Sequence, residues 1–211
     1  MADQSECRGT GVASQSRGRP GWLHVGALED RLQRVWNPGA FPPAEVLLAI
    51  MTLSAVPRVL GTRLAAHLHG GIVVGPGAVP DLPGFEALRG IQLPAQHGSW
   101  ERSAGVYDPN QRRIGVGSAP SPSVSVAGHE LGHATDHLDD MPSRSRFWGV
   151  LHARNAGHLA PPYRQDVAEL FAEAFACVLV RRARRLIQLF GDDEQTAQRA
   201  YTWLALRYGI G

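Results

Sequence analysis

The chain has 211 residues, which is long enough for one domain with a buried core. With 44% hydrophobic and 19% charged residues, its composition excludes a disordered or fibrous chain. The net charge of +2 is too small for a strongly basic protein, so neither nucleic acid nor a membrane is expected as a partner. The two cysteines, Cys7 and Cys177, are too few for a disulfide framework.

The N-terminal segment is rich in Gly, Ser, Arg and Gln. We expect residues 1–20 to be a disordered tail ahead of a single domain, residues 21–211. The tail has no apolar stretch of the kind found in secretory leaders. The longest apolar run, residues 46–56, is too short to span a bilayer and predicts a buried helix. The sequence therefore indicates a cytoplasmic protein, with leaderless or specialised secretion as the open alternative.

The first half of the domain predicts two helices, a strand and a hairpin. Pro43 precedes a helical pattern that ends near Leu53, and Pro57 opens a second helix that Gly70 stops. Short apolar runs separated by turn residues then predict strands. These are a strand at residues 71–75 and a hairpin at residues 104–117.

Three helices are predicted in the second half, at residues 122–138, 167–190 and 194–208. Ser121 and Asp166 are the expected N-caps of the first two, and Gly209 is expected to end the third. A small mixed sheet with an edge hairpin, followed by a helical C-terminal half, is an α+β fold.

The segment His-Glu-Leu-Gly-His in the first of these helices matches the H-E-x-x-H pattern. Histidines four residues apart lie one helical turn apart, so His129 and His133 can bind one zinc ion with Glu130 beside them. We expect about 0.02 chance copies of this pattern in a chain of this composition. The alternative is a solvated helix face. Gly132 lowers helix propensity, which suggests a close approach by another element.

A zinc peptidase needs a third protein ligand. His137 lies about 12 Å along the helix axis from His129, too far to share its metal. Glu169 and Glu173 lie four residues apart on the helix predicted from Val167, on a stripe of small apolar residues. Carboxylates on such a stripe need a cation or a hydrogen bond. Glu169 is therefore the candidate ligand, although Asp166 and Glu169 also fit a capping box.

Glu173 is the candidate for a supporting role next to the metal. Metal-bound imidazoles usually donate their second ring N–H to an acceptor that sets their orientation. We predict that the Glu173 carboxylate lies within hydrogen-bond distance of a ring nitrogen of His129 or His133.

The segments "GHELGHATDH", "AELFAEAF" and "GVYDPNQRRIGVG" resemble the catalytic domain of anthrax lethal factor and its relatives, which include the Pro-Pro endopeptidases. The resemblance implies a zincin-like fold in a zinc metalloendopeptidase that hydrolyses peptide bonds. It implies His129 and His133 as zinc ligands and Glu169 as the third. It further implies Glu130 as the general base and Tyr163 as the tyrosine that assists the transition state. A surface tyrosine is the alternative for Tyr163.

A peptide or protein substrate would lie extended along an exposed strand edge, for which "RRIGVG", residues 112–117, is the candidate. Two other functions stay open. A catalytically silent, zinc-stabilised protein-binding module would have the same fold. A nucleic-acid binder would depend on the arginine run at residues 181–185, which is more often a solvated helix face.

Overall fold

The computed structural model describes residues 23–37, 39–92 and 99–211. The expected tail and Cys7 lie outside the described residues. Cys177 is buried and has a free thiol. Of the described helices, none is by itself long and apolar enough to cross a bilayer.

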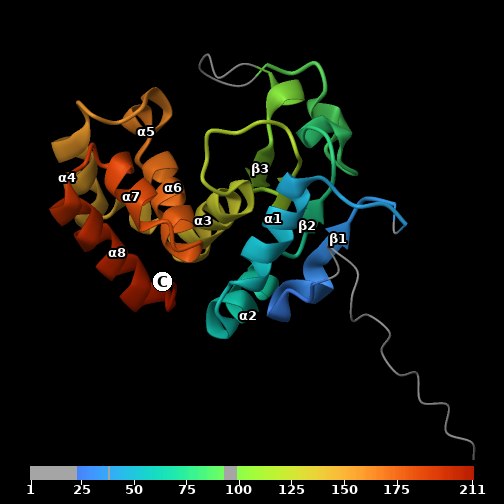
Figure 1. Cartoon of the computed structure of the whole chain (residues 1–211), viewed down its shortest axis with the longest axis horizontal. Helices are drawn as coiled ribbons and strands as arrows, with labels where there is room; N and C mark the ends of the chain where they lie inside the picture. Colours follow the sequence, from blue (N-terminus) through green and yellow to red (C-terminus); the bar gives the residue numbers. More distant parts are fainter. Residues whose placement is uncertain (1–22, 38, 93–98) are drawn as a thin grey trace, which may run out of the picture.

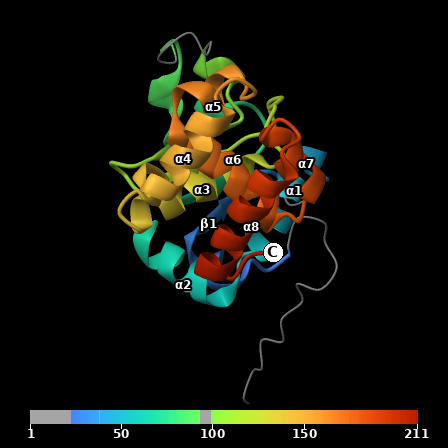
Figure 2. The ribbon, with the colours of Figure 1, turned by 90° about the vertical axis from the view of Figure 1, so that its left-hand side faces the viewer.

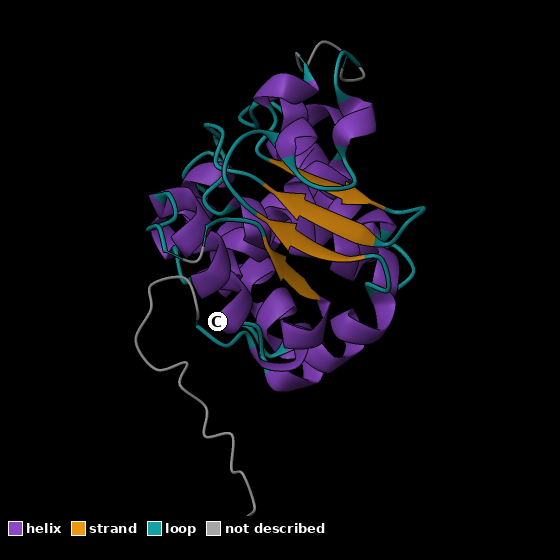
Figure 3. Ribbon diagram, turned by 90° about the vertical axis from the view of Figure 1, so that its right-hand side faces the viewer, coloured by secondary structure: helices purple, strands orange, loops and turns teal. Residues whose placement is uncertain are grey.

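Four short strands form one open sheet in the order β1-β2-β4-β3. The strands are β1 (Leu32–Arg34), β2 (Gly71–Val74), β3 (Gly105–Asp108) and β4 (Arg113–Val116). β1, β2 and β4 run parallel, and β3 is antiparallel to β4. Figure 3 shows the sheet with helices packed behind it. The predicted strand and hairpin are thus present, whereas β1 was not predicted from the sequence.

The sheet order corrects the expected substrate strand. β4, which contains most of "RRIGVG", pairs with β2 on one side and with β3 on the other. Its backbone groups are therefore not free to pair with a peptide. β3 is the edge strand of the hairpin, because among the described strands it pairs only with β4.

Two helices cover the N-terminal half, α1 (Ala44–Ser54) and α2 (Arg58–His67). Pro43 and Pro57 are their N-caps, as expected for residues that cannot donate a backbone hydrogen bond. α1 buries one apolar side against α3 and β2. Figure 1 shows these helices beside the sheet, on the opposite side of α3 from the C-terminal helices.

The C-terminal half is helical (Figure 2). Its helices are α3 (Val126–Leu138), α4 (Arg146–Asn155), α5 (Pro161–Gln165), α6 (Val167–Leu179), α7 (Ala183–Leu189) and α8 (Glu194–Tyr208). α4 and α5 lie in a stretch for which the sequence predicted no regular structure. α8 has the expected bounds, and Gly209 ends it with a left-handed backbone, φ 67°.

α3 begins four residues later than predicted, and its N-cap is Ser125 instead of Ser121. The Ser125 hydroxyl accepts a hydrogen bond from the Gly128 N–H at 3.2 Å. The Val124 N–H donates to Glu173 of α6 at 2.9 Å. This long-range bond satisfies the Val124 N–H just ahead of the helix and fixes the preceding segment against α6.

The helix predicted at residues 167–190 is two helices, α6 and α7. The break has the Schellman pattern: the Arg182 N–H donates to Cys177 O at 2.8 Å, and the Arg181 N–H donates to Val178 O at 3.1 Å. Arg181 takes the left-handed conformation, φ 57°. Glycine usually occupies this position, so an arginine carried no sequence signal for the end of the helix.

α3 is the central helix, because it packs against α6 on one side and against the sheet and the N-terminal helices on the other. A Cβ on Gly132 would lie 2.7 Å from Cα and 2.9 Å from the carbonyl oxygen of Ala172. The glycine therefore lets α6 approach α3 closely, as the sequence suggested. Phe171 and Phe175 of α6 are also buried, and their rings pack against aromatic residues of α4 and α8.

Candidate metal site and cleft

Three side chains on α3 and α6 converge on one point. His129 Nε2 lies 3.1 Å from His133 Nε2 and 3.2 Å from Glu169 Oε2. His133 Nε2 lies 3.4 Å from Glu169 Oε1. The histidines lie one turn apart on α3, and the close packing at Gly132 brings the first turn of α6 opposite them.

These separations fit a metal. Ligand atoms placed about 2.1 Å from a tetrahedral zinc ion lie about 3.4 Å from one another. Two imidazole nitrogens and a carboxylate oxygen are also the donor set that zinc takes in peptidases. His129, His133 and Glu169 can therefore hold a metal ion. Their side chains are 14%, 19% and 36% exposed, so the point where they converge can be reached from solvent.

Glu169 does not form the capping box. Asp166 alone caps α6, through a 2.8 Å hydrogen bond from the Ala168 N–H to its carboxylate. In a capping box the Asp166 N–H would donate to Glu169, but it donates to Pro162 O at 3.2 Å. The Glu169 side chain is turned instead toward the two histidines.

Glu173 lies on the other side of His129 from the convergence point. Its Oε2 accepts a hydrogen bond from His129 Nδ1 at 3.1 Å, and its Oε1 accepts the bond from the Val124 N–H. Its side chain is 4% exposed. This geometry directs His129 Nε2 toward the candidate metal position.

The two carboxylates control the charge of His129. Burial alone lowers the pKa of His129, but hydrogen bonds from the imidazole to Glu169 and Glu173 raise it to about 10. Burial raises the pKa of Glu169, yet its bonds with the histidines hold it well below the usual range. Without a metal, therefore, a proton on His129 partly takes the place of the cation.

Glu130 is buried beside the histidines, although the helical pattern put it on the side away from the core. It faces β3: a Cβ on Gly105 would overlap Glu130 Oε1. The backbone of Tyr107 hydrogen-bonds the carboxylate. Burial raises the pKa of Glu130, and the adjacent His129 and His133 oppose this. A carboxyl with a raised pKa is suited to exchange protons near neutral pH.

The candidate metal position lies in a cleft of about 870 Å³. One wall is β3 and the loop before it, and the other is α5 with the start of α6. Tyr163 of α5 borders the cleft, where burial first and the negative Glu173 and Glu169 second raise the pKa of its hydroxyl. The Tyr163 side chain is half-buried and packs against the hydrophobic core.

The remaining ionisable groups of α3 have other surroundings. His137 is exposed and outside the ligand group, and its ring lies 5.4 Å from that of Tyr107, edge to face. Asp136 is buried and accepts two hydrogen bonds from Ser143, which fastens the turn after the helix. Asp136 therefore stabilises the fold and is not directed into the cleft's candidate ligand group.

The sequence did not reveal the support of the edge strand. The Tyr107 hydroxyl lies 2.9 Å from His67 Nε2 at the end of α2. This bond anchors the strand whose backbone contacts Glu130. Gly105 and Tyr107 are two residues apart and therefore lie on the same face of β3. This alternation was the one sequence signal that could have placed both residues beside the H-E-x-x-H helix.

No family model and no curated protein matches the chain. Among solved structures, the chain is similar to the Pro-Pro endopeptidase PPEP-2 from Paenibacillus alvei, with a TM-score of 0.68 and 20% sequence identity. The match covers 87% of this chain and 100% of that chain. The likeness shows the fold, a mixed α/β domain with a small open sheet and a helical C-terminal half. The lethal factor part of the resemblance stays a prediction.

Proposed function

We propose that the protein is a zinc-dependent metalloendopeptidase. The observation that carries the proposal is the meeting of His129, His133 and Glu169 within tetrahedral ligand distances, beside the buried carboxylate of Glu130. An endopeptidase with the same fold supports it. The cleft supports it as well, because an endopeptidase must bind substrate residues on both sides of the bond that it cuts, and this needs a wide site.

Each residue has a defined part in this chemistry. A bound zinc ion would polarise the peptide carbonyl and lower the pKa of water in the open position. Glu130 takes the proton of the attacking water and passes it to the leaving amine. Tyr163 donates its hydroxyl proton in a hydrogen bond to the carbonyl oxygen as negative charge develops there. Glu173 holds the His129 imidazole in position.

The substrate would lie extended along β3 and pair with its open backbone edge. Gly105, Val106 and Tyr107 of this strand border the cleft, directly beside Glu130. Backbone pairing at this edge would place a peptide carbonyl between Glu130 and the candidate metal position.

A silent zinc-stabilised binding module is the alternative with the same fold. The position of Glu130 argues against it, since burying a carboxylate costs stability and a binding module would have no need for this side chain. Nucleic-acid binding has less support, because the arginine run is divided between the turn after α6 and the start of α7.

Two measurements on the purified protein test the proposal together. Metal analysis should find about one zinc ion per chain, and a degenerate peptide library should be cut at internal bonds. Full zinc occupancy without cleavage of any peptide would support the binding module. Cleavage that survives complete zinc removal would refute the metallopeptidase.

A further inference from the structure

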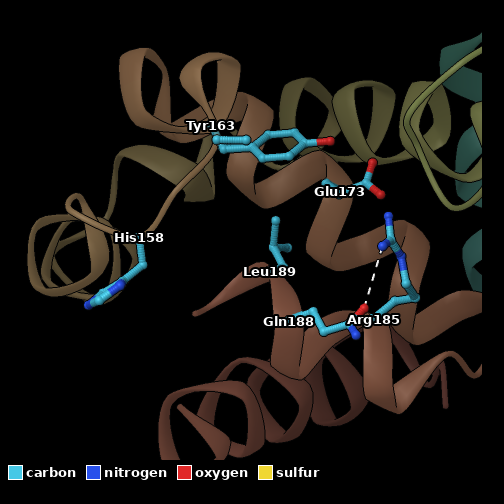
Figure 4. A pocket seen from close by; sticks show the side chains of 7 residues that line it. His158, Tyr163, Glu173, Arg185, Gln188 and Leu189 are labelled. Atoms are coloured by element: carbon cyan, nitrogen blue, oxygen red, sulfur yellow. Dashed lines mark hydrogen bonds between the residues drawn. The ribbon is translucent and has the colours of Figure 1, made fainter. Parts of the chain in front are cut away.

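A second, smaller cavity of about 180 Å³ lies behind Tyr163. Its walls come from α6, from α7 and from the segment that leads into α5. Figure 4 shows the Tyr163 ring at one end, Leu189 and Gln188 along the floor, and the guanidinium of Arg185 directed toward the Glu173 side.

The cavity adjoins the candidate active site. Tyr163 borders both the cavity and the large cleft. Glu173, which also borders the cavity, is bonded to His129. Arg185 Nη2 reaches to 3.5 Å from the carbonyl oxygen of Pro122, in the loop that lines the cleft. A residue bound beside the candidate metal position is therefore a near neighbour of this cavity.

The size of the cavity fits one side chain. An engineered cavity of about 150 Å³ in another protein holds a benzene molecule. The cavity here is slightly larger, too small for a stretch of peptide but sufficient for one long side chain. Leu189 and the Tyr163 ring supply apolar walls for the methylene groups of such a side chain.

Arg185 gives the cavity a cation whose hydrogen bonds go to neutral oxygens. Its hydrogen bonds to Gln188 Oε1 at 3.4 Å and to Pro122 O at 3.5 Å are both long. In the described part of the chain, no carboxylate lies within ion-pair distance of it. Both oxygens of Glu173 already accept hydrogen bonds, from Val124 and from His129.

We propose that this cavity is a specificity pocket that binds the carboxylate side chain of a substrate residue next to the scissile bond, with Arg185 as the charged partner. The inference rests on the proposed peptidase function. A guanidinium pairs with a carboxylate through two parallel hydrogen bonds, which is stronger than its present single bonds to neutral oxygens. The Gln188 side chain lies at the same end of the pocket, where its amide oxygen accepts a hydrogen bond from Arg185 that a substrate carboxylate would replace.

The experiment is a degenerate peptide library, cut by the wild type and by variants of Arg185, with the cleaved positions identified by mass spectrometry. The wild type should prefer Glu or Asp next to the cut, and Arg185→Gln should lose this preference by about tenfold to a hundredfold. Arg185→Glu should prefer Lys or Arg there instead. The matched control is Arg184→Gln, an exposed neighbour outside the cavity, which should cut like the wild type.

A second measurement separates this inference from the proposed function. The same library is selected for binding to Glu130→Gln, which needs no turnover, with and without Arg185→Glu. Glu130→Gln alone should enrich peptides with acidic residues. Glu130→Gln with Arg185→Glu should enrich peptides with basic residues. If the wild type cuts peptides but neither cleavage nor binding depends on acidic residues, the pocket assignment is wrong. If binding shows the acidic preference and the wild type cuts nothing, the pocket stands and the peptidase proposal fails.

Discussion

Glu173 and His129 are joined across the interface of α6 and α3, with Glu173 Oε2 3.1 Å from Nδ1 of the imidazole. The carboxylate is buried, so the bond is sheltered from competition by water. It leaves Nε2, the other ring nitrogen, to face Glu169 and His133. The orientation of the His129 imidazole thus depends on a residue outside the candidate ligand group.

Substitution of this positioning residue should weaken metal binding. Glu173→Gln keeps an oxygen that can accept the hydrogen bond but removes the negative charge, so zinc affinity should fall about tenfold. Competition with a chromogenic chelator measures the affinity. Glu45→Gln, an exposed change on α1, is the control and should bind zinc like the wild type. Equal affinities in both variants would make Glu173 a purely structural residue.

Loss of a ligand should remove the metal, whereas loss of the helix cap should not. Glu169→Ala and His133→Ala each leave two of three ligands, and both should lose zinc in metal analysis. Asp166→Ala removes the cap of α6 and should keep zinc while lowering the free energy of unfolding by about 1 kcal/mol. Full zinc occupancy in Glu169→Ala would contradict the ligand assignment.

The proton acceptor can be separated from the metal site. Glu130→Gln should keep zinc and fold, because Glu130 is outside the ligand group. Its rate on any cleaved peptide should fall by about 10² to 10⁴, the usual contribution of a general base. Kinetics on one fluorogenic peptide from the library measures this. A variant that cuts as fast as the wild type would exclude Glu130 as the base.

Two helical glycines should respond in opposite ways to an added methyl group, because only Gly132 lies at the close contact of α3 with α6. Gly132→Ala adds a methyl group against the Ala172 backbone and should lower the free energy of unfolding by about 1 to 3 kcal/mol. Gly149→Ala in α4 meets nothing within 4 Å, so it should raise stability by about 0.5 to 1 kcal/mol. Urea unfolding measures both. If both variants changed the free energy of unfolding by a similar amount, α3 and α6 would be able to move apart and accommodate the methyl group.

The metal-free protein should lose stability as the pH rises. The pKa of His129 is about 10 in the fold against an ordinary 6.5, so the folded state holds an extra proton between these values. Its contribution is fully present below pH 6.5 and is lost toward pH 10. Urea midpoints at about pH 6 and about pH 9, compared with His129→Gln, isolate it. A decline of the same size in the variant would assign the effect to other groups.

The amino-acid sequence alone determined the local part of the site. The spacing of His129 and His133 places their imidazoles on one helical turn, and this follows from helix geometry wherever the helix lies. The caps of α6 and α8 were predictable for the same reason, because Asp166 and Gly209 act within one turn of the backbone. The spacing of Glu169 and Glu173 indicated which face of α6 carries the carboxylates.

Only the tertiary structure decided which distant groups meet. Glu169 reaches the histidines because α6 packs closely at Gly132, and sequence spacing does not determine how two helices dock. The start of α3 depends on a hydrogen bond from Val124 to α6, so no local capping signal could locate it. The break at Arg181 requires a left-handed arginine, a conformation that this residue type rarely adopts, so no local signal marked it.

The open strand edge was likewise a tertiary outcome. Both strands of the hairpin are four-residue runs that mix apolar and polar residues, so the sequence could not distinguish β3 from β4 as the edge. β4 became internal when β2, more than thirty residues earlier, paired with its free side. Strand order depends on such long-range pairing, whereas the pattern along each strand records only which face is buried.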